Sequence, residues 1–122
     1  MNRKILIVDD DSRLLEALYS LLTFADFAVV TGKDGEEGLA LCKREHPDVV
    51  VSDYMMPALD GLELCAEMQA DPETKGIPFI LMSSSPPPAG TPQPHRVLKK
   101  PFEADTLMTA VAEAIRQGMS PV

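Results

Sequence analysis

Val49-Val50-Val51-Ser52-Asp53 is a short apolar run that leads directly into a carboxylate. Short runs rich in β-branched residues are typical of strands buried on both faces of a parallel sheet. Three other runs also lead into polar side chains: Ile5-Leu6-Ile7-Val8 before Asp9 and Asp10, Ile80-Leu81-Met82 before Ser83, and Val97-Leu98 before Lys99 and Lys100. If the four runs are parallel strands, their polar ends meet at one edge of the sheet, where open α/β sheets bind ligands.

Helical patterns fill the intervals between these runs. Asp34 with Glu37, and Asp60 with Glu63, have the spacing of capping boxes at helix N-termini. Gly118 is expected to end the last helix. The predicted elements are a strand over 4–8, a helix from 11 or 12 to about 25, a strand over 27–31, a helix over 34–47, a strand over 48–52, a helix over 60–71, strands over 77–82 and 96–98, and a helix over 103–118. Alternating strands and helices predict a doubly wound, parallel α/β sheet.

The stretch from Ser83 to His95, which reads SSSPPPAGTPQPH, interrupts this alternation. Its prolines exclude a helix of any length, because proline lacks a backbone N–H and clashes with the preceding turn. A crossover between parallel strands normally carries a helix. We therefore expect this proline-rich segment (83–95) to cross between two strands as extended or loose chain.

Length and charge limit the possible functions. The chain has 122 residues, which fits one domain over 1–122 with a short tail over 118–122. A net charge of -8 argues against binding to nucleic acid or to an anionic membrane. No signal peptide or long apolar span is visible, so we expect a cytoplasmic protein. Cys42 and Cys65 lie among apolar neighbours and are expected to be buried thiols rather than metal ligands.

The polar groups expected at the sheet edge suit a particular chemistry. They comprise carboxylates, a hydroxyl and an ammonium group. Carboxylates gathered in one place repel one another, and a divalent cation removes that penalty. Mg²⁺ fits such a site because it takes one or two carboxylates and also accepts phosphate oxygens. A carboxylate at a strand end can also attack a phosphoryl group and form an acyl phosphate.

Four stretches together resemble the receiver domain of two-component response regulators. They are ILIVDDD from Ile5, VVVSDYMMPALDGLEL from Val49, PFILMSS from Pro78 and KKPF from Lys99. The resemblance runs from Lys4 to about Gln117. It implies a five-stranded, flavodoxin-like sheet of order 2-1-3-4-5, and a signalling protein rather than a turnover enzyme.

The resemblance also implies roles for single residues. Asp53 matches the phosphoacceptor, and the implied partner is a sensor histidine kinase or a phosphotransfer protein. Lys100 matches the lysine that pairs with the phosphoryl oxygens, and Ser83 matches the hydroxyl that bonds to the phosphoryl group. Pro101 matches a position that is typically cis in the family.

The same resemblance implies a Mg²⁺ site. Asp9 and Asp10 match the acidic pair of the family, which holds the metal together with Asp53. The backbone carbonyl of Met55 matches a further ligand position. Asp11, although acidic, is interpreted as a helix cap.

Two departures from the family pattern affect the expected output. The proline-rich segment replaces the usual fourth helix, and Val97 stands where the family commonly has Tyr or Phe. An interaction module that phosphorylation does not control, or a phosphoryl sink, therefore remains an alternative. The proline-rich segment either transmits the signal itself or is a tolerated replacement. A phosphatase of the haloacid-dehalogenase kind would carry an aspartate two residues after the nucleophile, where this chain has Met55.

Overall fold

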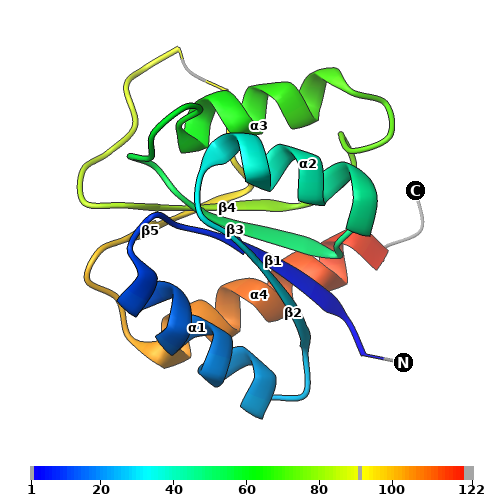
Figure 1. The fold of residues 1–122 in the computed structure, drawn as a ribbon, viewed down its shortest axis with the longest axis vertical. Coiled ribbons are helices and arrows are strands. Elements are labelled where there is room, and N and C mark those ends of the chain that lie inside the picture. The colour runs from blue at the N-terminus through cyan, green and yellow to red at the C-terminus, as the bar shows by residue number, and fades with distance from the viewer. Residues whose placement is uncertain (1, 91, 120–122) are drawn as a thin grey trace.

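The chain folds into three layers around a parallel sheet (Figure 1). The structure is a computed structural model that describes residues 2–90 and 92–119. Its sheet has five strands in the order β2-β1-β3-β4-β5, as the resemblance implied. The elements are β1 (Lys4–Val8), α1 (Ser12–Phe24), β2 (Ala28–Gly32), α2 (Gly35–Glu45), β3 (Val49–Asp53), α3 (Gly61–Ala70), β4 (Phe79–Ser83), β5 (Arg96–Lys99) and α4 (Ala104–Met119).

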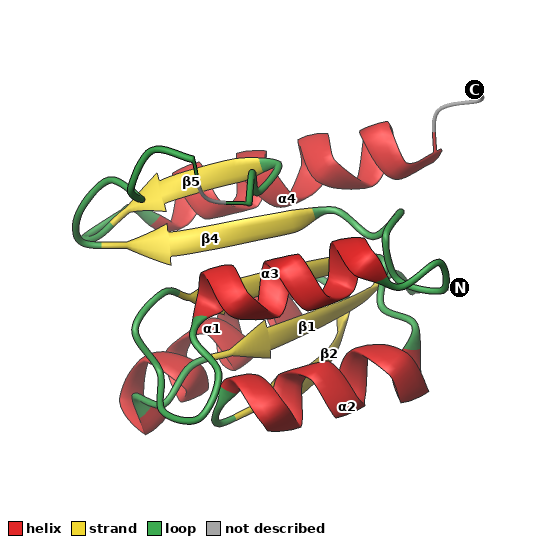
Figure 2. Ribbon diagram, turned by 90° about the horizontal axis from the view of Figure 1, so that it is seen from above, coloured by secondary structure: helices red, strands yellow, loops and turns green. Residues whose placement is uncertain are grey.

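Helices cover both faces of the sheet. Helices α2 and α3 lie over one face, and α1 and α4 lie over the other (Figures 1 and 2). Because side chains alternate along a strand, Ile5 and Ile7 of β1 pack toward α1 and α4, whereas Leu6 and Val8 pack toward α2 and α3. All four side chains are fully buried, as expected for a strand in the middle of a doubly wound sheet.

Aspartates cap three of the helices. Asp11 accepts hydrogen bonds from the first backbone N–H groups of α1. Asp60 and Glu63 form the full capping box predicted for α3. The corresponding glutamate of α2, Glu37, instead accepts from the N–H of Lys33 at 2.7 Å, while Asp34 caps the helix alone. Local spacing therefore predicted where these helices begin.

Several predicted boundaries were wrong by one or two residues. Strand β2 begins at Ala28 because the N–H of Phe27 bonds to the Leu22 carbonyl and closes α1. Strand β4 begins at Phe79, since its register with β3 starts at the Val50–Phe79 pair. Helix α4 does not stop at Gly118 but continues to Met119, and the rest of the predicted tail lies outside the described residues.

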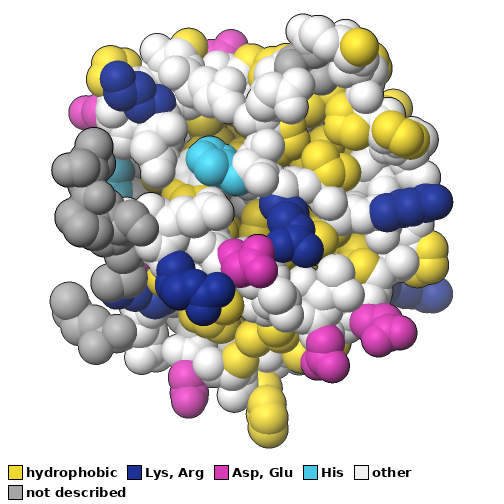
Figure 3. Space-filling view, turned by 180° about the vertical axis from the view of Figure 1, so that it is seen from behind, with side chains coloured by type: hydrophobic (Ala, Val, Ile, Leu, Met, Phe, Trp, Pro, Cys, Tyr) yellow, Lys and Arg dark blue, Asp and Glu magenta, His cyan; other side chains and the backbone are white. Residues whose placement is uncertain are grey.

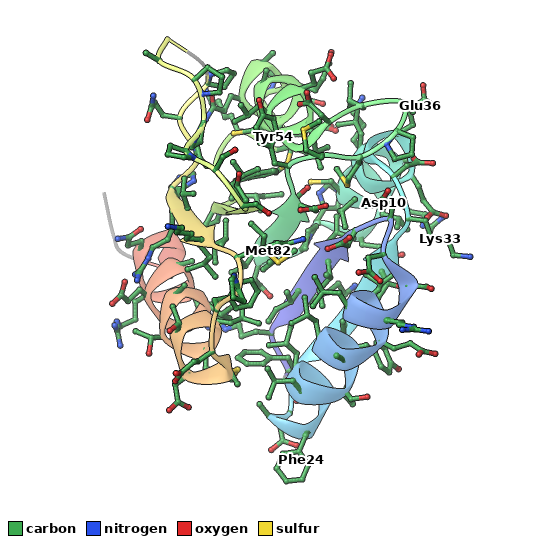
Figure 4. The ribbon with its side chains drawn as sticks, turned by 90° about the vertical axis from the view of Figure 1, so that its left-hand side faces the viewer. Asp10, Phe24, Lys33, Glu36, Tyr54 and Met82 are labelled. Carbon is green, nitrogen blue, oxygen red and sulfur yellow. The ribbon has the colours of Figure 1, made fainter. Side chains whose placement is uncertain are left out.

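Two further expectations concern buried thiols and membranes. Cys42 and Cys65 are buried and unpaired, and burial raises the pKa of each thiol to about 11. Within the described residues, none of the helices combines the length and the apolar character needed to span a membrane. A single large apolar side chain, Phe24 at the end of α1, is 90% exposed and points away from the body of the chain (Figure 4).

The fourth crossover contains no helix in its described part, as predicted. The proline-rich segment leaves β4 and returns to the start of β5, an edge strand, as irregular chain (Figure 2). Val97 of β5 is 41% exposed, although its partner Leu81 in β4 is fully buried. Apolar side chains gather over the proline-rich segment on this side of the molecule (Figure 3).

Candidate functional site

The carboxyl ends of the strands meet at one edge, which Figure 4 views directly. Asp10, Tyr54 and Met82, labelled there, mark the ends of β1, β3 and β4. The strand register sets how the polar groups meet. In the sheet, Val8 of β1 pairs with Ser52 of β3, and Met82 of β4 pairs with Asp53 of β3. Asp9 directly follows Val8, and Ser83 directly follows Met82. The two residues therefore lie on either side of the end of β3, where Asp53 is.

Asp53 and Lys100 form the central contact of the site. The Lys100 Nζ lies 2.8 Å from Asp53 Oδ1 and 3.6 Å from Asp9 Oδ2. The Lys100 N–H also donates to the Ser83 carbonyl at 2.8 Å, which fixes the chain just beyond β5. The peptide bond from Lys100 to Pro101 is cis.

The neighbours of Lys100 stabilise its protonated, positively charged form. Burial alone would lower the pKa of this amine. The hydrogen bond to Asp53 and the negative charges of Asp9 and Asp53 outweigh burial and raise the pKa of Lys100 above its ordinary value. At neutral pH the site therefore holds a positive charge next to the Asp53 carboxylate.

Asp9 is the most deeply buried acid of the site, with 1% of its surface exposed. Its Oδ1 accepts the Asp11 N–H at 2.9 Å, but its buried Oδ2 has no hydrogen-bond partner among the residues described. Burial raises the pKa of the Asp9 carboxyl, and the nearby charge of Asp53 adds to this effect. The Lys100 ammonium at 3.6 Å offsets the charge of this oxygen in part, but a buried carboxylate oxygen without a hydrogen bond is still costly.

The three acids fit a divalent cation. Asp9, Asp10 and Asp53 each place a carboxylate oxygen within 4.8 Å of the others. Asp9 is buried, whereas Asp10 is exposed and Asp53 lies between them in accessibility. A set of hard oxygen donors with one side open to water suits Mg²⁺, which keeps some of its waters when bound.

Ser83 lies at the same edge but is engaged with its own chain. The residue is 3% exposed, and its hydroxyl donates to the Ser85 carbonyl and accepts the Ser85 N–H at 3.2 Å. The serine is thus placed beside the site without bonding to Asp53 or Lys100 through its side chain in this state.

Helix α3 begins directly against the backbone of the site. The Gly61 N–H donates to the Tyr54 carbonyl at 2.7 Å, and a Cβ on Gly61 would lie 2.3 Å from the Asp53 carbonyl oxygen. The hydroxyl of Ser52 donates to the same Asp53 carbonyl oxygen, at 2.9 Å. The position of Asp53 therefore depends on the absence of a side chain at Gly61.

The structure brings together most of the residues that the sequence indicated. Asp9, Asp53 and Lys100 are in contact, and Asp10 lies in the same cluster. The side chain of Met55 is 70% exposed, and the predicted role of its carbonyl stays a prediction. The contacts of Gly61 were not predicted, although the capping-box spacing at Asp60 already indicated that a helix begins there.

A comparison with known sequences identifies relatives of this chain. The family profile described as "Response regulator receiver domain" matches residues 5–112. Transcriptional regulatory protein GlrR of Escherichia coli K12 is 38% identical over 118 residues, which cover 93% of this chain and 26% of GlrR. The chain spans about a third or less of the curated relatives that it matches.

Solved structures show the same fold. Chemotaxis response regulator CheY4 of Vibrio cholerae has a TM-score of 0.86 at 26% identity, over 93% of this chain and 99% of CheY4. The receiver domain of sensor histidine kinase PA1611 from Pseudomonas aeruginosa, crystallised with a magnesium ion in its active site cleft, has a TM-score of 0.88 at 21% identity. That match covers 95% of this chain and 99% of the PA1611 domain, and it shows the fold alone.

Proposed function

Because this chain belongs to the family of response regulator receiver domains, we propose that it is a phosphorylation-dependent switch with Asp53 as the phosphoacceptor. The donor is the phosphohistidine of a sensor kinase or of a phosphotransfer protein. The observation that carries this proposal is the contact between Asp53 and Lys100 beside the buried Asp9 oxygen that accepts no hydrogen bond.

The reaction transfers a phosphoryl group from an imidazole nitrogen of the donor to a carboxylate oxygen of Asp53. A carboxylate oxygen of Asp53 attacks the phosphorus, the P–N bond breaks, and the donor imidazole leaves with the bonding electron pair. Lys100 holds the Asp53 carboxylate in place and faces the negative charge of the incoming phosphoryl oxygens. Asp9, Asp10 and the Met55 carbonyl are the groups that would hold Mg²⁺ with Asp53, and the bound ion would neutralise phosphoryl charge.

Asp53 is expected to be phosphorylated as a switch, and the protein is not expected to hydrolyse phosphate esters catalytically. We propose a cytoplasmic signalling protein whose output is contact with another protein. The net charge of -8 supports a protein partner rather than nucleic acid. A hydrolase would instead release phosphate continuously from a generic ester.

Mass spectrometry tests the assignment of Asp53. Incubation of the full chain with acetyl phosphate and Mg²⁺ should add one phosphoryl group, and Asp53→Asn should abolish the addition because an amide cannot act as the nucleophile. Asp105→Asn, which changes an exposed acid in the first turn of α4, is the matched control and should be labelled like the unaltered protein. Equal labelling of the Asp53→Asn protein would overturn the proposal.

Two observations favour an alternative function. Val97 offers no aromatic ring at the edge strand, and the described part of the fourth crossover contains no helix. An interaction module indifferent to phosphorylation, or a phosphoryl sink, would tolerate both features. A partner that binds equally well with and without phosphorylation of Asp53 would identify the module.

A further inference from the structure

The peptide unit that follows Asp53 is held at both of its ends. Its N–H, which belongs to Tyr54, donates to the Met82 carbonyl of β4 at 2.9 Å. The C=O and N–H of a trans peptide unit point in opposite directions, so the Asp53 carbonyl is directed away from β4. There it accepts the hydroxyl of Ser52 at 2.9 Å.

The hydrogen-bond ladder of the sheet has already ended on that side of β3. The pairing of β1 with β3 stops at Val8 and Ser52, so no residue of β1 lies opposite Asp53. Within the described residues, the Ser52 hydroxyl is the one hydrogen-bond donor to the Asp53 carbonyl. Ser52 therefore takes the place of a ladder donor at the end of the strand.

Water has little access to this hydrogen bond. Ser52 is 0% exposed and Asp53 is 9% exposed. The start of α3 closes over the Asp53 carbonyl, since a Cβ on Gly61 would lie 2.3 Å from its oxygen. A buried carbonyl that loses its donor either stays unsatisfied or turns toward another donor. Such a turn changes the backbone torsions of Asp53, on which the orientation of its side chain depends.

We propose that Ser52 is a positioning residue for the transfer reaction: its hydroxyl fixes the backbone of Asp53 and so holds the carboxylate in one orientation for attack. The inference rests on the proposed function of Asp53. Ser52 takes no part in bond making or breaking. The orientation that it maintains is the one in which Asp53 Oδ1 lies 2.8 Å from Lys100 Nζ. A nucleophile that is held in one orientation reacts faster than one that samples several.

Two variants of equal shape isolate the hydroxyl of Ser52. Ser52→Thr keeps the hydroxyl, and Ser52→Val has the shape of Thr without it. The full chain is labelled by acetyl phosphate at saturating Mg²⁺, and intact mass follows the reaction. Labelling should be roughly three- to tenfold slower for Ser52→Val than for Ser52→Thr, which is the rate equivalent of one hydrogen bond. Ser52→Ala adds no bulk to the buried position, and it should be slowed to the same extent relative to the unaltered protein.

Thr74 provides the matched control. It is 0% exposed, and its hydroxyl donates to the Met68 carbonyl at 2.8 Å. Thr74 lies beyond the last turn of α3, whereas the first turn of that helix contacts the site. Thr74→Val should therefore destabilise the fold in the same way and leave the labelling rate unaltered. Equal slowing in Ser52→Val and Thr74→Val would show a general loosening and overturn the proposal.

Carbon-13 NMR of the Asp53 carbonyl detects the hydrogen bond without any labelling. A carbonyl carbon resonates further upfield when its oxygen loses a hydrogen bond. The Asp53 resonance should therefore lie upfield in Ser52→Val and Ser52→Ala, and keep its position in Thr74→Val. A resonance that does not move in Ser52→Ala would show that the bond is absent in solution, and the proposal would be wrong.

The failure of this role and the failure of the proposed function give different results. If Asp53 is labelled but Ser52→Ala and Ser52→Val react as fast as the proteins that keep the hydroxyl, Ser52 only satisfies a buried carbonyl, and the phosphoacceptor stands. If no phosphoryl group is added to the unaltered protein, both proposals fall.

Discussion

Asp9 is a residue whose charge opposes folding in the absence of metal. Its carboxyl is almost fully buried, and that burial raises its pKa above the ordinary value of 3.8. The folded chain therefore binds this proton more readily than the unfolded chain does. Stability falls as the pH rises from about the ordinary value through the raised folded pKa, and acidification restores it.

Replacement of Asp9 by Asn should stabilise the metal-free protein at pH 7. We expect a gain of about 1 kcal/mol in the free energy of unfolding, the usual scale for a poorly satisfied buried polar group. The gain should shrink as the pH falls, because the unaltered Asp9 then becomes protonated. Urea unfolding across the acid range, without metal, measures both effects.

Mg²⁺ provides the complementary measurement. A ligand that binds only the folded state at 100 times its Kd raises the free energy of unfolding by about 2.7 kcal/mol. Asp9→Asn should reduce this gain. Asp10→Asn changes an exposed acid of the same cluster, so it should affect metal-free stability less than Asp9→Asn does. A free energy of unfolding that does not change in millimolar Mg²⁺ would contradict the metal site.

At the scale of the element, the beginning of α3 controls the backbone of the site. A Cβ on Gly61 would lie 2.3 Å from the Asp53 carbonyl oxygen and 2.7 Å from Leu81 Cδ1. Gly61→Ala should therefore lower the free energy of unfolding by about 1–3 kcal/mol and slow the labelling of Asp53 by acetyl phosphate. Chemical denaturation and intact mass measure the two effects.

Gly76 offers the matched control for that substitution. A Cβ at Gly76 meets no atom within 4 Å, and its φ is not left-handed. Gly76→Ala should change stability by no more than about 0.5 kcal/mol and leave labelling unaltered. Similar losses in both variants would show that the effect comes from glycine replacement in general and not from the contact with Asp53.

The ends of the helices and strands differ in how well the sequence predicted them. The N-caps at Asp11 and Asp60 were predictable because capping depends on residues within one turn. The start of β4 was not, since it depends on its register with β3, which lies far away in sequence. In the site, strand ends predicted that Asp9, Asp53 and Lys100 would meet. The difference in burial between Asp9 and Asp10 was not predictable, because the two acids are adjacent and have the same side chain.

At the scale of the whole molecule, this receiver fold has no helix in the described part of its fourth crossover. A helix would satisfy its own backbone groups, whereas a chain rich in proline cannot. Side chains take over that task at both ends: Ser83 bonds to Ser85 near β4, and His95 bonds to Phe79 near β5. The proline content of the segment predicted the absence of a helix but not these substitutes. The Ser83–Ser85 bond is local, whereas the Phe79–His95 bond joins residues 16 apart in the chain that only the fold brings together.

His95 provides the last prediction, because it fastens the edge of the sheet. The Phe79 N–H donates to Nδ1 of the imidazole, so the start of β4 depends on a side-chain acceptor. His95→Ala should lower the free energy of unfolding by about 0.5–1.5 kcal/mol, the net worth of one hydrogen bond, and speed amide exchange at Phe79. His95→Asn should keep most of that stability, since its Oδ1 occupies a position close to Nδ1 and accepts the same N–H. If the Ala variant exchanges at Phe79 like the unaltered protein, the edge is held by β4–β5 pairing alone, and the imidazole is only a surface group.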